Sequence, residues 1–290
     1  NKITNILVSL LANAKNWKNA EELWTILSGV STIEKSTLDA LLEAFNTNSQ
    51  VNCCVNISGY DCYGNFKKNR DFTGFVTLDD FACWVVADGM GGHQFGSVAS
   101  QMVAESLLDI PFEPDLDHRL EYAANALQWV NFHLSCERTL TEPEQIIGST
   151  VMALIAHPGR AACLWAGDSR CYLLRRGVLY QISEDHSLVQ QWVNAKRITP
   201  EAAMQHPKSN IVTRAIGVSR ELVLESAELE MYPGDMLLLC TDGLYRELSS
   251  EIIIRSLSES EPEKAVQKLM QHALAGEAKD NITAVVVRNN

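Results

Sequence analysis

Four aspartates stand where the chain leaves an apolar, strand-like run. They are Asp88 in A-D-G-M-G-G-H, Asp168 in A-G-D-S-R, Asp242 in T-D-G-L and Asp280 in K-D-N-I-T. Strand ends are places where a rigid scaffold can present side chains to a common cleft. Carboxylates that converge there repel one another, and a hard divalent cation with oxygen ligands relieves that repulsion. The pattern therefore predicts a metal site built from carboxylates.

Glycines accompany these aspartates. Gly89 would let a backbone carbonyl turn toward a metal, while Gly91 and Gly92 permit a tight bend because they have no Cβ. A single Asp-Gly pair would indicate only an ordinary turn. Two such pairs, together with G-D-S-R and K-D-N after strand-like runs, favour the metal site over unrelated turns.

The elements that must position these residues are short. Strands are expected at 81–87, 150–156, 161–166, 170–174, 178–182, 222–231, 236–240 and 282–287. Helices are expected at 97–108, 120–134, 186–195, 200–206, 249–258 and 262–275. The strand runs are apolar on both faces, which indicates sheets that are covered on both sides. Residues 1–50 form a separate pattern with helical spacing, so we expect a helical N-terminal module before a main domain at 51–290.

Composition narrows the class of protein. A chain of 290 residues can bury one large core, and it has no apolar run of about 18 residues, which excludes a membrane-spanning helix. The formal net charge of −12 argues against nucleic-acid binding. A phosphorylated substrate would then need a local cationic site. The eight cysteines include no C-x-x-C pair, which favours reduced thiols and a cytoplasmic location. Because the first residue is Asn, we expect the sequence to begin inside a longer chain.

The ordered motifs resemble a known family. Metal-dependent protein phosphatases (the PPM, or type 2C, serine/threonine phosphatases) carry the A-D-G-M-G-G-H, G-S-T, A-G-D-S-R, D-H-S, T-R-A-I-G, T-D-G-L and D-N-I-T motifs in this order. Here they occupy 87–93, 148–150, 166–170, 185–187, 213–217, 241–244 and 280–283. The resemblance covers residues 55–288.

The resemblance implies a fold and a set of roles. The fold is α+β, a four-layer α-β-β-α sandwich of two mixed, mainly antiparallel sheets flanked by helices. The cofactors implied are two Mn²⁺ or Mg²⁺ ions, with a possible third. Asp88, Asp242 and Asp280 would be the catalytic metal ligands. Gly89 would bind one ion through its carbonyl, Asp168 would hold the third ion with help from Asp242, and Asp71 and Asn281 would support these ligands. Two cations about 3.5–4 Å apart would activate a bridging water for in-line attack on phosphorus.

One motif departs from the family pattern. The family usually has a phosphate-binding Arg shortly before N-E-D, whereas this chain has G-N-F-K-K-N-R-D at 64–71. Asp71 matches the last residue of that motif. The phosphate would have to be bound by Lys67, Lys68 or Arg70, and a Lys lacks the bidentate fork of Arg. A solvated loop is the alternative explanation of these cations.

Residues 184–216 resemble the flap that covers the active site in bacterial members. We expect differences in this segment to select the phosphoprotein that fits. Arg170 and Arg214 could be taken for phosphate ligands, but arginines that brace a buried site or a loop are the commoner case.

The predicted function is hydrolysis of phosphoserine and phosphothreonine in proteins, opposing a bacterial Ser/Thr kinase. Details of the motifs resemble members associated with type VI secretion. A phosphatase-like module that binds a phosphopeptide or a partner without turnover is the alternative, because the phosphate-binding motif is altered. In either case the helices of residues 1–50 could dock a partner. A small-molecule phosphohydrolase or a nuclease is the third possibility.

Overall fold

The computed structural model describes residues 51–57, 60–66, 70–78, 81–91, 93–108, 115–141, 147–276 and 280–290. The helical module expected at residues 1–50 lies outside the described residues. Most of the main domain is described, including the four aspartates of the predicted metal site.

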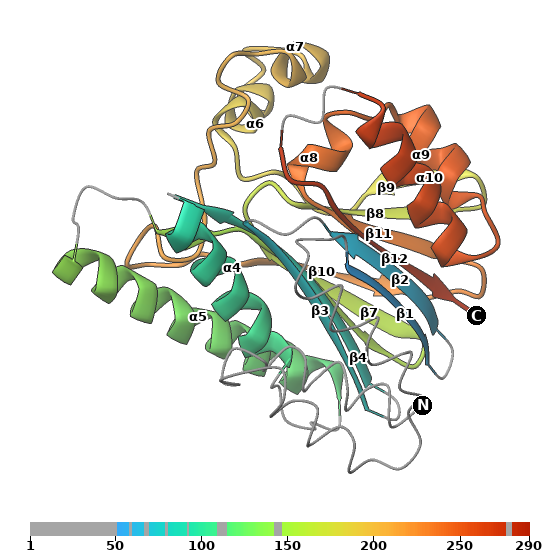
Figure 1. Ribbon diagram of the computed structural model, residues 1–290, viewed down its shortest axis with the longest axis horizontal. Coiled ribbons are helices and arrows are strands. Elements are labelled where there is room, and N and C mark those ends of the chain that lie inside the picture. The colour runs from blue at the N-terminus through green and yellow to red at the C-terminus, as the bar shows by residue number, and fades with distance from the viewer. Residues whose placement is uncertain are drawn as a thin grey trace, which may run out of the picture. The chain divides into compact units, whose positions relative to one another are not determined.

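The described strands form two sheets, here called sheet A and sheet B (Figure 1). Sheet A has the order β1 (Val51–Ile57), β2 (Tyr60–Phe66), β12 (Thr283–Asn289), β11 (Met236–Cys240), β8 (Arg170–Arg175) and β9 (Val178–Gln181). Sheet B has the order β10 (Glu225–Glu230), β7 (Arg160–Ala166), β6 (Val151–His157), β4 (Phe81–Met90) and β3 (Asp71–Leu78), and the short β5 (Gly148–Ser149) pairs with β4. Each pairing whose register the structure gives is antiparallel.

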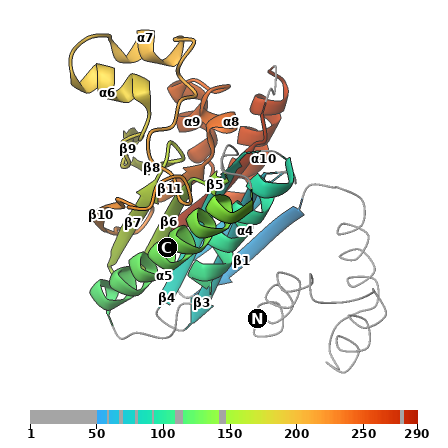
Figure 2. The ribbon, with the colours of Figure 1, turned by 90° about the vertical axis from the view of Figure 1, so that its left-hand side faces the viewer.

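Helices cover the outer faces of both sheets (Figures 1 and 2). Sheet B is covered by α4 (His93–Leu108) and α5 (Leu116–Thr141), and sheet A by α9 (Ser250–Leu257) and α10 (Pro262–Leu274). Three shorter stretches complete the helices of the described residues: α6 (Leu188–Asn194), α7 (Pro200–Met204) and α8 (Asp242–Tyr245). The predicted α-β-β-α sandwich is therefore confirmed, as are the expected strands and helices, with ends that differ by a few residues.

The alternation of side chains along each strand builds the layers. In β4, Cys83 and Val85 pack under the helices of sheet B, whereas Trp84 and Val86 pack between the two sheets. Successive residues of a strand point to opposite faces, so a strand that is apolar at every position fits only between two covered faces. Burial of each such side chain contributes about 1.5–3 kcal/mol. The continuous apolar runs of the sequence thus specify the inner layers of the sandwich.

Two sequence expectations at the aspartates were wrong. Asp88 and Gly89 do not end the strand, because β4 continues to Met90 by exchanging its partner β6 for β5. Asp280 does not follow a strand either, because it comes after α10 and shortly before β12. Apolar runs mark buried segments, but they do not distinguish the start of a strand from its end.

Candidate active site

The structure brings the aspartates together from separate parts of the chain. Asp88 lies near the end of β4, Asp168 in the turn between β7 and β8, Asp242 at the start of α8, and Asp280 just before β12. Burial raises the pKa of Asp88 well above its ordinary value, and repulsion from Asp71, Asp242, Asp168 and Asp280 raises it further. Such mutual repulsion requires the five carboxyl groups to face a common region.

Asp71 is the buried member that joins the two sheets. It stands opposite Asp88 in the register of β3 and β4. Its Oδ2 accepts hydrogen bonds from Thr241 Oγ1 at 2.9 Å and Thr283 Oγ1 at 2.6 Å. Burial raises the pKa of Asp71 to about 6, although the two threonine hydrogen bonds oppose that rise. Because Thr241 directly precedes Asp242, these bonds set the position of α8 relative to β4.

The backbone of Asp88 is held by the G-S-T motif. The Asp88 N–H donates to Thr150 Oγ1 at 3.0 Å, and the Thr150 N–H donates to the Asp88 carbonyl at 2.8 Å. Ser149 Oγ also donates to that carbonyl, at 3.1 Å. Thr150 Oγ1 in turn lies 2.8 Å from Ser169 Oγ, next to Asp168. The motif therefore ties Asp88 to the Asp168 turn, a role that its spacing alone does not indicate.

Close approach of two backbone segments explains the glycine in T-D-G-L. A Cβ added to Gly243 would lie 1.9 Å from the Asn281 carbonyl oxygen, so only glycine allows α8 to pack against the segment that carries Asp280. Asn281 donates its backbone N–H to Asp280 Oδ1 at 2.9 Å. This fits the expected supporting position of Asn281, whose role stays a prediction.

Two arginines neutralise part of the aspartate cluster. Arg246 Nε lies 3.0 Å from Asp242 Oδ2, and Arg246 Nη2 lies 3.7 Å from Asp168 Oδ2. The first contact is an ion pair without the alignment of a hydrogen bond. Arg70 Nη2 lies 2.7 Å from Asp280 Oδ1. Sequence analysis missed Arg246. It caps the end of α8, four residues after Asp242, which is the helical spacing at which side chains meet.

The phosphate-binding cations predicted from sequence are only partly placed. Arg70 lies at the edge of the cluster with 32% of its side chain exposed. Lys67 and Lys68 lie outside the described residues, so their role stays a prediction. Of the three, Arg70 is the cation that the structure places beside a predicted metal ligand.

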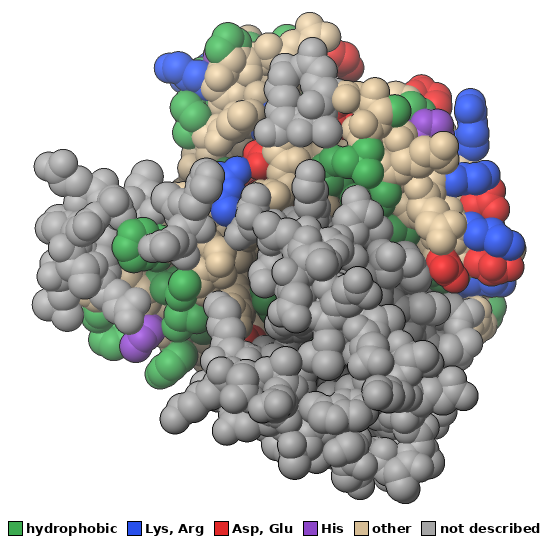
Figure 3. All heavy atoms as spheres, viewed as in Figure 1, with side chains coloured by type: hydrophobic (Ala, Val, Ile, Leu, Met, Phe, Trp, Pro, Cys, Tyr) green, Lys and Arg blue, Asp and Glu red, His purple; other side chains and the backbone are tan. Residues whose placement is uncertain are grey.

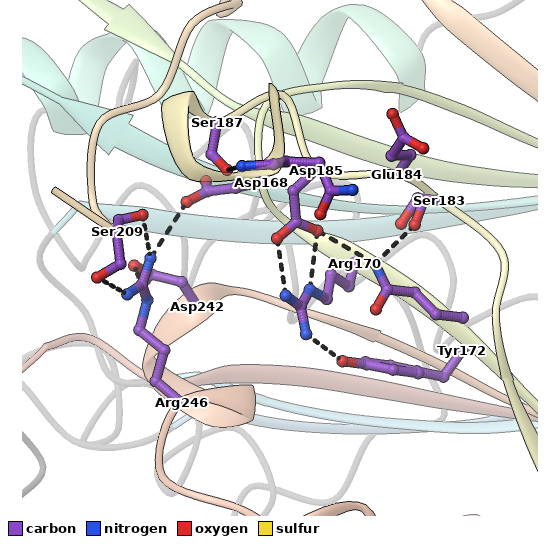
Figure 4. A network of polar contacts seen from close by, with 12 residues as sticks. Asp168, Arg170, Tyr172, Ser183, Glu184, Asp185, Ser187, Ser209, Asp242 and Arg246 are labelled. Atoms are coloured by element: carbon purple, nitrogen blue, oxygen red, sulfur yellow. Dashed lines mark hydrogen bonds and ion pairs between the residues drawn. The ribbon is translucent and has the colours of Figure 1, made fainter. Parts of the chain in front are cut away.

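Arg170 braces the site, as expected. Its Nε and Nη2 donate to the two carboxylate oxygens of Asp185 at 2.8 and 2.7 Å, and its Nη1 donates to Tyr172 Oη at 2.7 Å (Figure 4). Its guanidinium also lies 3.7 Å from the centre of the Tyr245 ring. These contacts use one face and the edges of the guanidinium, which indicates a structural role.

The flap, residues 184–216, projects from the sandwich and carries α6 and α7 (Figures 1 and 2). Ser187 Oγ and Thr199 Oγ1 accept backbone hydrogen bonds that begin these helices. At its base, Leu188 N donates to the Ile211 carbonyl at 2.9 Å, and Thr213 N donates to the His186 carbonyl at 2.7 Å. The flap is therefore closed by a short two-stranded stem.

Arg214 and His186 pack at the base of the flap. Arg214 forms an ion pair with Glu225, and His186 Nε2 lies 3.2 Å from the same carboxylate. His186 Nδ1 accepts the Gly167 N–H at 3.1 Å, which leaves Nε2 to carry the proton. Burial lowers the pKa of His186, and Arg214 lowers it further. Both residues brace the flap, in agreement with the expectation for Arg214.

The donor set fits a hard divalent cation. Asp242 Oδ1 and Asp71 Oδ1 are buried without a hydrogen-bond partner, and burial raises the pKa of Asp88, Asp168 and Asp242. As they stand, no three His, Cys, Asp or Glu side chains of the described residues form a ligand cluster for one ion. Arg70 pairs with Asp280, and Arg246 pairs with Asp242 and Asp168. The cluster nevertheless presents more buried negative charge than these two arginines neutralise, and oxygen ligands suit Mg²⁺ and Mn²⁺.

A protein-family model described as Protein phosphatase 2C matches residues 58–284. The serine/threonine protein phosphatase PstP of Mycobacterium tuberculosis is 37% identical over 204 residues, which cover 69% of this chain and 39% of PstP. The chain thus spans about two fifths of the length of this relative. The serine/threonine phosphatase Stp of Listeria innocua is 34% identical over 236 residues, which cover 78% of this chain and 93% of Stp.

Solved structures give the same result. PppA, described as a key regulatory component of T6SS in Pseudomonas aeruginosa, has a TM-score of 0.72 and 38% identity, and the match covers 82% of this chain and all of PppA. The catalytic domain of PstP in complex with two manganese ions has a TM-score of 0.67 and 32% identity, and the match covers 79% of this chain and 96% of that domain. From the motifs, the sandwich and these matches, the chain belongs to the protein phosphatase 2C family of serine/threonine protein phosphatases.

Proposed function

We propose that the domain hydrolyses phosphoserine and phosphothreonine in proteins at the cluster of Asp88, Asp168, Asp242 and Asp280. The observation that carries this proposal is the convergence of these carboxyl groups: burial raises the pKa of Asp88 and of Asp168, and repulsion from neighbouring aspartates raises both further. Structural stability alone would not favour such a cluster, because each buried charge costs several kcal/mol unless it is paired. The family relationship supports the reaction.

Asp88, Gly89, Asp242 and Asp280 would hold two divalent cations, for which we propose Mn²⁺ or Mg²⁺. When bound, the cations supply an activated water and offset the charge of the phosphate. Asp71 holds α8 and β12 in register with β4 through its two threonine hydrogen bonds. The protein thereby positions the reacting groups before substrate arrives, which is how preorganised charge lowers a barrier.

A phosphoprotein is the proposed substrate. On the face seen in Figure 3, acidic and basic side chains alternate over α10, where Lys264 pairs with Glu261 and Lys268 with Glu259. This mixture does not present the basic surface that nucleic acid requires. The flap exposes Met204 and Ile211, apolar side chains that suit contact with a protein surface.

The cellular compartment of the protein and the domain boundary within the chain stay proposals. The five cysteines whose side chains are described are free thiols, which supports the cytoplasm as the compartment. No helix among the described residues combines the length and apolar character needed to cross a membrane. The boundary near residue 50, and a docking role for the helices expected before it, stay predictions.

The PppA match supports a place in type VI secretion. We propose that the protein opposes a Ser/Thr kinase of such a system. A strain that lacks the gene should accumulate phosphorylated secretion-system proteins, and the intact gene, but not its Asp242→Asn variant, should reverse this. Phosphoproteomics measures the effect, and unchanged phosphorylation of those proteins would refute the pathway while leaving the reaction itself unaffected.

Asp242→Asn tests the reaction. The substitution keeps the size of the side chain but removes a charge from the proposed cation site, so Mn²⁺-dependent hydrolysis of a phosphothreonine peptide should fall about a hundredfold or more. Circular dichroism should show an unchanged fold. Asp117→Asn, at a carboxylate on α5 that is 73% exposed, is the matched control and should keep full activity. Wild-type protein that shows no turnover with Mn²⁺ would instead support a binding module.

Arg70→Met tests the phosphate contact. Loss of the guanidinium should raise KM for the phosphopeptide about tenfold with a smaller change in kcat, because the contact serves binding more than the chemical step. Arg70→Lys should recover part of the loss, since it restores the charge without the fork. An unchanged KM in Arg70→Met would mean that another group binds the phosphate.

The raised pKa values predict how metal-free protein responds to pH. Burial raises the pKa of Asp71 to about 6 and that of Asp168 to about 7. The folded state thus binds protons more tightly than the unfolded chain, whose aspartates titrate near pH 4. The free energy of unfolding in EDTA should therefore be greatest near pH 4 and should fall as the pH rises to about 7. The fall should be about 1.4 kcal/mol per pH unit for each group that is protonated only in the folded state.

Thermal melts in EDTA and in Mn²⁺ measure this effect. The melting temperature in EDTA should fall between about pH 5 and about pH 7, and the gain from Mn²⁺ should be larger at the higher pH, where the ligands are ionised. Asp168→Asn should show a flatter profile. A melting temperature in EDTA that rises across this window would contradict the prediction.

A further inference from the structure

Arg246 contacts the aspartate cluster and the flap at the same time. It follows directly after α8, and its guanidinium faces Asp242 and Asp168 on one side (Figure 4). On the other side, Nη1 donates to Ser209 Oγ and Nη2 donates to the Ser209 carbonyl, both at 2.9 Å. A single side chain thus connects the proposed metal site to the flap.

The carboxylate pair needs a cation at this point. The side chains of Asp168 and Asp242 are only 6% and 13% exposed. Burial raises the pKa of Asp168, repulsion from Asp242 raises it further, and Arg246 opposes the rise. Among the described residues, Arg246 is the basic side chain within ion-pair distance of both. Arg170 and Arg214 are engaged with Asp185 and Glu225 instead.

The flap contact is a specific one. Ser209 is half-buried, whereas its neighbours Lys208 and Asn210 are exposed. The stem bonds at Leu188 and Thr213 hold the base of the flap, while Arg246 binds the limb that returns from α7. The Arg246 guanidinium donates to both the hydroxyl and the carbonyl of Ser209, and two such hydrogen bonds give a directional contact. The flap segment that returns from α7 is therefore held in a defined position next to α8.

We propose that Arg246 is a built-in cation, that it fills the place predicted for a third metal ion between Asp168 and Asp242, and that it latches the flap through Ser209. The inference rests on the proposed metal site for the other ions. A divalent ion between the two carboxylates would have to displace the guanidinium and so break its contacts with Ser209. By linkage, a metal ion at that position and the latched flap oppose each other to the same extent.

Three substitutions separate the two roles. Arg246→Met keeps an unbranched apolar stem but removes the charge and the donors. Arg246→Lys keeps the charge and loses the fork. Arg255→Met, at an exposed arginine in the last turn of α9, is the control. Calorimetric titration with Mn²⁺ gives the number of ions per chain, and hydrogen–deuterium exchange of residues 205–213 reports the flap independently of activity.

Wild type, Arg246→Lys and Arg255→Met should each bind two Mn²⁺ ions, and Arg246→Met should bind a third. In metal-free protein, exchange in residues 205–213 should be about tenfold faster in both Arg246 variants than in wild type, because the Ser209 contacts are lost. Arg255→Met should exchange like wild type.

Other outcomes would refute one of the two parts of the proposal, the built-in cation or the flap latch. Three ions in wild type would refute the built-in cation, even if Arg246→Met failed to fold. Two ions in a folded Arg246→Met would refute it as well, and unchanged exchange in Arg246→Lys would refute the latch. No Mn²⁺ binding by wild type would instead refute the proposed function on which this inference rests.

Discussion

Repulsion among buried carboxylates is the constraint on which the rest of the structure depends. Asp71 and Asp88 from sheet B, Asp168 from the turn between β7 and β8, and Asp242 from a helix start face a common region, and burial makes each charge costly. Such an arrangement persists only if the surrounding structure holds it in place. The apolar layers above and below each sheet provide that rigidity, and cations or bound protons must offset the remaining charge.

The protein provides some of that compensation itself. Arg70 pairs with Asp280, and Arg246 with Asp242 and Asp168. Hydroxyl groups do the rest of the positioning: Thr241 and Thr283 bind Asp71, and Thr150 holds the backbone of Asp88. The site is thus a network in which Asp71, Asp88, Asp168 and Asp280 each have a positioning partner from another part of the chain. Such networks must be satisfied as a whole to be stable.

The sequence was sufficient for the layers and for the identity of the acidic residues. Continuous apolar runs predicted β4, β6, β7 and β11, because burial on both faces leaves a direct trace in the residue types. The continuation of β4 through Asp88 left no such trace, since it depends on pairing with β5, which lies about 60 residues away. The contact between Arg246 and Ser209 was equally out of reach, because it is set by how the flap folds back over α8.

The position of Asp71 links the site to the interior of the sandwich. Its own strand belongs to sheet B, while Thr283 begins a strand of sheet A and Thr241 follows another. The two layers therefore cannot slide past each other without pulling these hydroxyls away from the carboxylate. Repacking of the residues between the layers, such as Trp84 or Leu239, would then reach the reaction centre through a shear of the sandwich, at a distance from any residue that touches substrate.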